Sequence, residues 1–190
     1  MKLTNKANSI IKSRLTKQEK IISLCELVRD IPYENTGSHS LKDLVEKGRG
    51  SCTPKHIFLA KYLKKINVPV KFLITPFYYK KLKLAFPGSK GALLNEMPIS
   101  YHTCLKARIN RKWTIIDVTW DSKLKSFPIN KNWDGQTNMK LAVTPESITE
   151  IKTDPRIFKR KQIKKYDQEE MRTIVKFYSF FGEFLLKSRK

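Results

Sequence analysis

The chain has 190 residues, enough to bury a substantial core without disulfides or a structural metal, and 40% of them are hydrophobic. That composition excludes an intrinsically disordered protein. No apolar stretch approaches the roughly 20 residues of a membrane span, and no apolar run follows the basic residues 1–6 as in a secretory signal. We therefore expect a soluble, cytoplasmic protein that does not bind membranes.

The positive charge is unusually large. Lys and Arg number 39 against 17 acidic residues, a net charge of +22, and residues 47–116 hold fifteen Lys or Arg but one carboxylate, Glu96. One interpretation is a surface for an anionic substrate or for nucleic acid. The other is a Lys-rich surface that only solvates many faces. We favour the second, because no groove-reading motif accompanies the charge.

The first clear element is a helix that begins with a capping box. The Thr16 hydroxyl and the Glu19 carboxylate can each accept a free backbone N–H of the first turn, and apolar residues follow at helical spacing. Cys25 falls on the apolar face. It is therefore expected in the core rather than in a reactive site.

Two more helices and a strand follow. A short helix over 40–45 should end at Gly48, because glycine takes the left-handed conformation that often terminates a helix. The next helix should begin at Cys52 and end at residues 67–69, where a proline follows. Residues 70–75 are then predicted to form a strand.

The middle of the chain predicts a long loop and a hairpin. Residues 76–99 have no clear period, include Pro87–Gly91, and are interpreted as an excursion of the kind that often covers a site. Residues 101–109 and 112–118 are strand-like. Asn110–Arg111 between them is a fair two-residue hairpin loop, since Asn tolerates positive φ.

The C-terminal part is basic and ends in a helix. Asp154–Pro155 opens a basic stretch over 159–165, and Asp167–Glu170 then caps the last helix. We expect its apolar face to be core rather than a partner surface. That face carries Met171, Ile174, Val175, Tyr178, Phe181, Phe184 and Leu185.

Cys52 is the candidate nucleophile. It lies in the run 48–56, where a glycine-punctuated loop leads into a helix. The helix macrodipole and the unpaired N–H groups of the first turn favour a thiolate, so the pKa of a cysteine there can fall below the usual value of about 8.5. Three scattered cysteines (Cys25, Cys52, Cys104) suit a reducing compartment rather than a disulfide framework.

The hairpin supplies a base and a carboxylate. With Asn110–Arg111 as the loop, paired residue numbers sum to 221, and His102, Cys104, Asp117 and Thr119 share one face of the two strands. His102 and Asp117 are then diagonal neighbours on adjacent strands, with backbones about 7–8 Å apart and side chains within reach of a hydrogen bond. An imidazole held by a carboxylate is the base that a cysteine nucleophile requires. Residue spacing alone does not predict contact between His102 and Cys52.

Five segments together resemble a known family, the transglutaminase-like branch of the papain-like cysteine enzymes. They are Tyr33 after a capped helix, Gly50-Ser51-Cys52, Asn67-Val68-Pro69-Val70, Tyr101-His102 and the run Trp113–Asp121. The resemblance covers about residues 21–121. It implies an α+β fold in which the helix of the nucleophile packs against an antiparallel sheet, with further helices at both ends of the chain. It also implies a catalytic Cys52-His102-Asp117 triad and a thioester intermediate.

Two positions differ from the family pattern. Many members have tryptophan two residues after the histidine, where this chain has Cys104, and many have proline after the aspartate, where it has Val118. The triad is unaffected by either difference, but the shape of the acyl pocket can change. Cys104 could form a redox-sensitive pair with Cys52, although a buried cysteine usually behaves as a small hydrophobe.

Several residues near the triad have two interpretations. His56, one turn after Cys52, is either an alternative base or, more often in such positions, a hydrogen-bonded packing residue. His39 is expected to be exposed in a loop. The Cys52 N–H should form part of an oxyanion hole. Tyr33 and Asn35 are candidates for the second donor, which the sequence does not identify.

Three further side chains also have more than one interpretation. Lys55 could favour the thiolate, bind an anionic substrate or merely solvate its helix. Trp113 and Trp120 flank the aspartate, and sealing the core against the sheet is favoured over substrate contact. The cysteines and histidines lack zinc-site spacing, so no metal and no cofactor are expected.

The sequence thus predicts one domain over residues 1–190, with a core of about 16–145 and a basic helical extension of about 151–190. We expect a cysteine enzyme that hydrolyses an amide or related acyl bond of a protein, a peptide or a smaller amide, and the basic surface favours an acidic substrate. One alternative is a non-catalytic basic module that binds nucleic acid or an acidic protein. The other is an acyltransferase of the arylamine N-acetyltransferase type. The oligomeric state is open.

Overall fold

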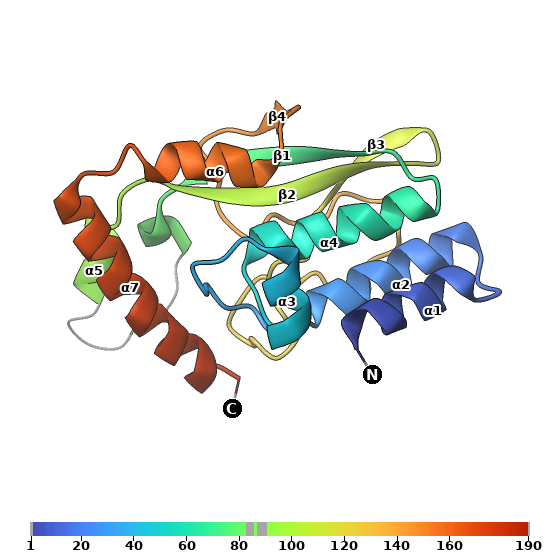
Figure 1. Cartoon of the computed structure of the whole chain (residues 1–190), viewed down its shortest axis with the longest axis horizontal. Coiled ribbons are helices and arrows are strands. Elements are labelled where there is room, and N and C mark those ends of the chain that lie inside the picture. Colours follow the sequence, from blue (N-terminus) through green and yellow to red (C-terminus); the bar gives the residue numbers. More distant parts are fainter. Residues whose placement is uncertain (1, 83–85, 87–90, 190) are drawn as a thin grey trace.

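A computed structural model describes residues 2–82, 86 and 91–189 and shows an α+β architecture, as predicted (Figure 1). Helices and strands follow one another along the chain as α1 (Leu3–Lys12), α2 (Lys17–Arg29), α3 (Leu41–Lys47), α4 (Cys52–Lys65), β1 (Val70–Phe77), the 3-10 helix η1 (Tyr79–Leu82), α5 (Ala92–Glu96), β2 (Ser100–Ile109), β3 (Lys112–Ile116), β4 (Thr149–Ile151), α6 (Pro155–Ile163) and α7 (Gln168–Lys187). None of the helices in the described ranges is both long and apolar enough to cross a membrane.

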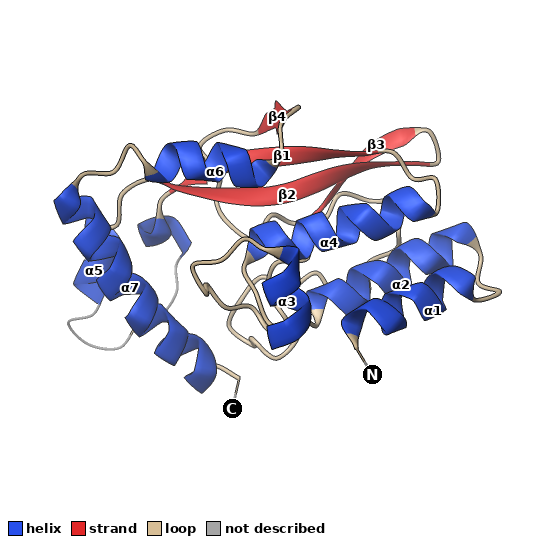
Figure 2. Ribbon diagram, viewed as in Figure 1, coloured by secondary structure: helices blue, strands red, loops and turns tan. Residues whose placement is uncertain are grey.

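The strands form an antiparallel sheet in the order β3-β2-β1-β4. Helices α1 to α4 lie along one side of this sheet, whereas α5 and α7 lie beyond one end of it, close to the start of β2 (Figure 2). The site described below lies where these two groups of helices meet.

Three helices begin or end at the residues that the sequence predicted. Thr16 and Glu19 form a reciprocal capping box at the start of α2, with the Glu19 carboxylate accepting the Thr16 N–H at 2.7 Å. Gly48 ends α3 with φ of 63°, in the left-handed region that glycine favours. Cys52 is the first residue of α4. These three helix boundaries are therefore confirmed.

The hairpin is also confirmed, including its register. Asn110 and Arg111 both have positive φ, 47° and 67°, as a two-residue type I′ turn requires. Leu105 pairs with Ile116 across β2 and β3, so paired residue numbers sum to 221. Because β3 ends at Ile116, two residues earlier than expected, Asp117 lies just beyond the ladder and is free to turn toward His102.

A first group of buried side chains, the inner cluster, joins α1, α2 and α4 to the sheet. Its fully buried members include Leu24, Val28, Leu59, Leu63, Leu105, Ala107 and Ile116. Cys25 also belongs to it, at 2% exposure, which confirms its predicted place in the core.

A second group, the cavity cluster, is mainly aromatic and lies at the other end of α4. Its members include Tyr33, Cys52, Phe77, Tyr79, Trp120, Leu124, Phe127, Phe177 and Phe181. The rings of Phe177 and Phe181 stack 5.3 Å apart on α7, and Tyr79 packs against Phe177 with ring centroids 4.5 Å apart. Through these contacts the C-terminal helix covers the end of the sheet.

Some elements differ from the prediction. Helices α1 and α5 and strand β4 were not expected, whereas α6 falls within the expected basic helical extension over 151–190. The end of β1, η1 and α5 occupy part of the expected excursion over residues 76–99. Pro87 to Lys90, part of that excursion, lie outside the described residues. On α7, Val175 is 65% exposed rather than in the core, because the buried stripe passes through Phe177, Phe181 and Leu185 instead.

Candidate active site

Cys52 is held at the point where α4 meets β2. Ser51, the residue before the helix, makes no side-chain cap, so the N–H groups of the first turn are not capped by it. The Thr53 and Thr103 hydroxyls are 3.0 Å apart, which joins the first turn of α4 to β2. The cysteine is 5% exposed and lines a cavity.

His102 and Asp117 form a buried pair. The His102 Nε2 lies 2.7 Å from the Asp117 Oδ2. The same carboxylate accepts the N–H of Ala142 on Oδ2, and the N–H and hydroxyl of Thr119 on Oδ1. Burial alone would raise the pKa of Asp117, but His102 and these donors hold the pKa well below its usual range. Asp117 is therefore a fixed anion that orients the imidazole.

The imidazole in turn meets the thiol. Because Nε2 faces Asp117, Nδ1 is the ring nitrogen left to interact with the Cys52 sulfur, and His102 lowers the pKa of that thiol. Burial lowers the pKa of His102, but the Asp117 carboxylate and interactions with Cys104 and Cys52 raise it well above the usual value. These pKa shifts favour an imidazolium beside a thiolate.

Lys159 on α6 is a candidate functional residue that the sequence did not indicate. Its Nζ lies 3.4 Å from the Cys52 sulfur, although 107 residues separate the two in the chain. Burial raises the pKa of Cys52, whereas Lys159, His102 and the Thr103 backbone lower it, and the result is a pKa of about 5. The basic stretch over 159–165 was the only sequence signal, and it did not distinguish this lysine from its neighbours.

His56 has the packing role. Its Nδ1 donates to the Cys52 carbonyl at 2.8 Å, and its Nε2 accepts the Val118 N–H at 3.1 Å, so both ring nitrogens are engaged and the ring is neutral. Burial lowers the pKa of His56 to about 4. The residue therefore fixes α4 to the end of the hairpin.

Lys55 has a structural role that none of the three expectations described. The side chain is fully buried, and its Nζ donates to the carbonyls of Arg29, Ile31 and Thr119 at 2.7–2.9 Å. These acceptors match the three N–H bonds of an ammonium group. Burial lowers the pKa of Lys55 to about 7. Lys55 thus joins the end of α2 to the loop after Asp117.

Tyr33 and Trp120 pack together in the wall of the cavity, with ring centroids 4.6 Å apart. Asp121 accepts the Tyr33 N–H at 2.8 Å and the Arg189 guanidinium at 2.7 Å. Arg189 also donates to the Tyr33 carbonyl at 2.7 Å. The C-terminal end of α7 is therefore tied to the wall that faces Cys52.

Two expectations about loop and surface residues are wrong. His39 is half-buried rather than exposed, lines the cavity beside Lys159, and burial lowers its pKa to about 4. Trp113 does not seal the core: it is 40% exposed, and the ammonium groups of Lys71 and Lys106 lie over its ring. Trp113 is on the part of the hairpin that α4 does not cover.

Asn35 lines the cavity, and its amide oxygen accepts the Gly37 N–H at 3.1 Å. The amide NH₂ group, rather than this oxygen, is the part of Asn35 that can serve as a second oxyanion donor.

Cys104 lies close to the pair of His102 and Asp117. The potential ligand atoms of these three residues lie within 4.8 Å of one another, which is close enough for a metal ion. However, Asp117 already accepts four hydrogen bonds, and burial raises the pKa of the Cys104 thiol. A metal would have to displace those donors and deprotonate the thiol, so the donor set suits a hydrogen-bonded site better than a metal centre.

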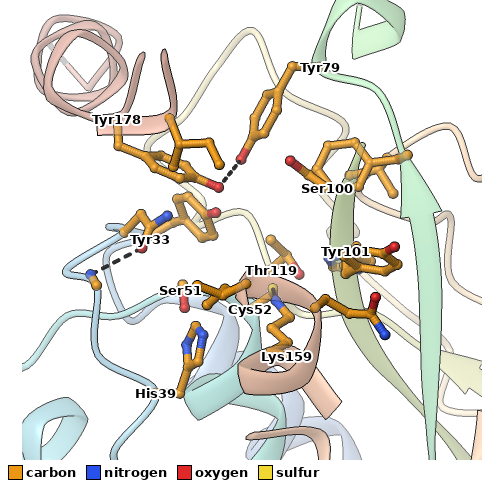
Figure 3. Close-up of a pocket in the computed structure, with 18 of the residues that line it drawn as sticks. Tyr33, His39, Ser51, Cys52, Tyr79, Ser100, Tyr101, Thr119, Lys159 and Tyr178 are labelled. Carbon is orange, nitrogen blue, oxygen red and sulfur yellow. Dashed lines mark hydrogen bonds between the residues drawn. The ribbon is translucent and has the colours of Figure 1, made fainter. Parts of the chain in front are cut away.

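The cavity next to Cys52 has a volume of about 470 Å³. Figure 3 shows Cys52 on one side with Ser51, His39 and Lys159 beside it, and Tyr79 and Tyr178 across the space. Residues from η1, β2, the loop after Asp117, α6 and α7 line it, so it is assembled from segments far apart in the sequence.

No family model matches the chain, and no curated protein does. Two solved structures share weak similarity with it. One, described as "a Putative Cysteine Protease from Cytophaga hutchinsonii", is 16% identical over 65% of this chain and 38% of its own, with a TM-score of 0.43. The other, described as a TGase, is 11% identical over 64% of this chain and 32% of its own, with a TM-score of 0.44. This chain therefore corresponds to less than half of either protein.

Proposed function

We propose that the protein is a cysteine hydrolase that cleaves an amide or related acyl bond through a thioester on Cys52. One observation carries the proposal: the His102 Nε2 lies 2.7 Å from the Asp117 carboxylate, and the same imidazole lowers the pKa of the buried Cys52 thiol. This is the arrangement of a nucleophile, a base and an orienting carboxylate.

The chemistry follows from the charges of these groups. The Cys52 thiolate attacks the carbonyl carbon, a C–S bond forms, and the carbonyl π electrons move to the oxygen. As the tetrahedral intermediate collapses, the bond to the leaving group breaks, and His102 gives its proton to the departing nitrogen or oxygen. Water then loses a proton to His102 and attacks the thioester, which releases the carboxylic acid and restores the thiolate.

The negative oxygen of the intermediate needs donors. The Cys52 N–H at the start of α4 is one, because the first N–H groups of a helix have no partner within the helix. We assign the Lys159 ammonium as the second. It lies 3.4 Å from the attacking sulfur and hence close to the carbon under attack. When the Cys52 thiolate forms the C–S bond, the sulfur loses its negative charge and the carbonyl oxygen gains one. The Lys159 ammonium can then pair with that oxygen instead of with the sulfur.

Alkylation with iodoacetamide across pH tests the activated thiol. Each cysteine is followed by mass spectrometry, so the buried Cys25, whose pKa is raised by burial, is an internal control. We expect Cys52 to react with a midpoint near pH 5 and the midpoint to rise in His102→Ala. If Cys52 titrates as an ordinary thiol and His102→Ala has no effect, the proposal is wrong.

A further inference from the structure

The cavity beside Cys52 is large for a short polar acyl group. Its volume of about 470 Å³ lies within the range of roughly 300–1,000 Å³ found for small-molecule sites. Its described lining residues include no Asp or Glu, and the cations among them, Lys159 and the His102 imidazolium, lie at the Cys52 end. The remainder of the lining is mainly aromatic and aliphatic.

The aromatic part of the lining is less polar than its tyrosines suggest. The Tyr79 hydroxyl bonds to the Tyr178 hydroxyl at 3.3 Å, the Tyr166 hydroxyl to the Ile99 carbonyl at 2.6 Å, and the Trp120 indole N–H to the Ala142 carbonyl at 2.9 Å. These donors are used within the protein. The cavity therefore offers mainly ring surface to whatever enters it, together with the polar groups of Tyr33, Tyr101 and Gln162.

The rim of the cavity is apolar as well. Ile163 at the end of α6 and Val175 on α7 line the cavity and are 44% and 65% exposed. Large exposed aliphatic side chains at the mouth of a cavity extend its apolar surface outward. A ligand that covers these side chains removes apolar surface from water, which favours its binding.

Polar groups without partners lie at the opposite end. The Ser51 hydroxyl and the His39 Nδ1 are buried beside Cys52 and find no hydrogen-bond partner among the residues that the structure describes. Figure 3 shows both residues on the Cys52 side of the cavity, across from Tyr79 and Tyr178. The site thus has a polar end at the nucleophile and an apolar remainder.

From this asymmetry we propose that the substrate is a small molecule whose acyl half is an extended apolar group that occupies the aromatic part of the cavity. The proposal rests on the hydrolase function above. During deacylation, water must enter where the leaving group has departed, whereas the acyl group stays in place. The polar end therefore suits the leaving group and water, and the enclosed apolar part suits the acyl group.

Esters of p-nitrophenol test this proposal with one leaving group and acyl chains of two, four, eight and ten carbons. The thiolate forms a bond to the carbonyl carbon, and p-nitrophenolate departs with the electron pair of the C–O bond. Each CH₂ group that enters the cavity can raise kcat/KM up to about fourfold, from about 0.8 kcal/mol per buried CH₂. We expect octanoate to exceed acetate by at least about tenfold, and intact-protein mass spectrometry to show the acyl group on Cys52.

Variants identify the part of the cavity that the chain contacts. Ile174→Trp should fill the aromatic part and lower the octanoate-to-acetate ratio, and Val175→Glu should lower it by charging the rim. Leu186→Glu is the control: the same class of exchange on α7, 61% exposed, and not in the lining. It should leave the ratio unchanged.

The outcomes separate the two proposals. If acyl-enzyme forms equally well with acetate and octanoate, the apolar-acyl proposal is overturned while the hydrolase function stands. If the ratio is high but the two α7 lining variants do not change it, the chain binds elsewhere and the proposal also fails. If no ester acylates Cys52, the hydrolase function itself is wrong, and the substrate assignment falls with it.

Discussion

The inner cluster and the cavity cluster meet on one helix but are built differently. In the inner cluster, aliphatic side chains of α2, α4 and the hairpin fill the interior. In the cavity cluster, aromatic rings from several separate segments surround a space of about 470 Å³. Helix α4 belongs to both, because Cys52 lines the cavity while Phe58, Leu59 and Leu63 pack in the inner cluster. The well-packed inner cluster thus supports the helix that carries Cys52, and the cavity cluster leaves space beside its sulfur.

The largest effect should come from Asp117→Asn, which acts at the boundary of the two clusters. The amide cannot carry the charge that stabilises the imidazolium, and it disturbs the tautomer of His102. We expect kcat to fall by about 10³–10⁴-fold, with the fold retained by circular dichroism. Asp121→Asn is the matched control, because Asp121 is equally buried but binds Tyr33 and Arg189 instead of His102. Equal losses in both variants would remove Asp117 from the mechanism.

The second prediction compares the packing of the two clusters directly. Leu59 in the inner cluster and Leu124 in the cavity cluster are both 0% exposed, so alanine removes the same atoms from each. Leu→Ala in a rigid core costs about 2–5 kcal/mol of unfolding free energy, depending on how far the site collapses. We expect Leu59→Ala near the top of that range, since helix and sheet surround it.

Leu124→Ala should fall near the bottom, because Leu124 lies in a loop, which can relax around the lost atoms more easily than a helix packed on a sheet. Urea unfolding measures both variants, and alkylation of Cys52 should keep its pH midpoint in each. A larger loss for Leu124→Ala would contradict the proposed difference in packing.

The third prediction concerns Lys159, which reaches the nucleophile from α6. Removing the ammonium in Lys159→Met should raise the pKa of Cys52 from its value of about 5. Because the thiolate is present only above its pKa, the acid limb of alkylation should move to higher pH, by at least about one unit. Lys161→Met, on the same helix but exposed, should not move it. Equal midpoints in the two variants would show that Lys159 does not stabilise the thiolate.

Local signals predicted the part of the fold that depends on local contacts. The capping box of Thr16, the left-handed Gly48 and the Asn110–Arg111 turn each act within a few residues, and each occurs where the sequence indicated. The hairpin register followed from the turn, and with it the approach of His102 to Asp117. Local chemistry was sufficient for two members of the candidate triad.

The rest depends on packing between distant segments. Lys159 and Arg189 reach the site because α6 and α7 fold back over it, and His39 comes to line the same cavity as Lys159. No periodicity in residues 151–190 specifies where those helices dock. Lys55 illustrates the same limit, since its three carbonyl acceptors come from two segments outside its own helix.

The smallest effect should come from two equivalent capping boxes, one in each region. Thr16 and Glu19 begin α2, and Asp167 and Glu170 begin α7 with the same reciprocal bonds. Replacing either cap by alanine should cost about 1 kcal/mol of helix stability. In Thr16→Ala the loss should appear in global unfolding, because α2 is part of the inner cluster. In Asp167→Ala it should appear as faster hydrogen exchange in the first turn of α7, beside the lining residue Met171, with the global midpoint nearly unchanged. Equal losses of global unfolding free energy in the two variants would mean that α7 unfolds only together with the inner cluster. Helix α7 would then be as stable as α2.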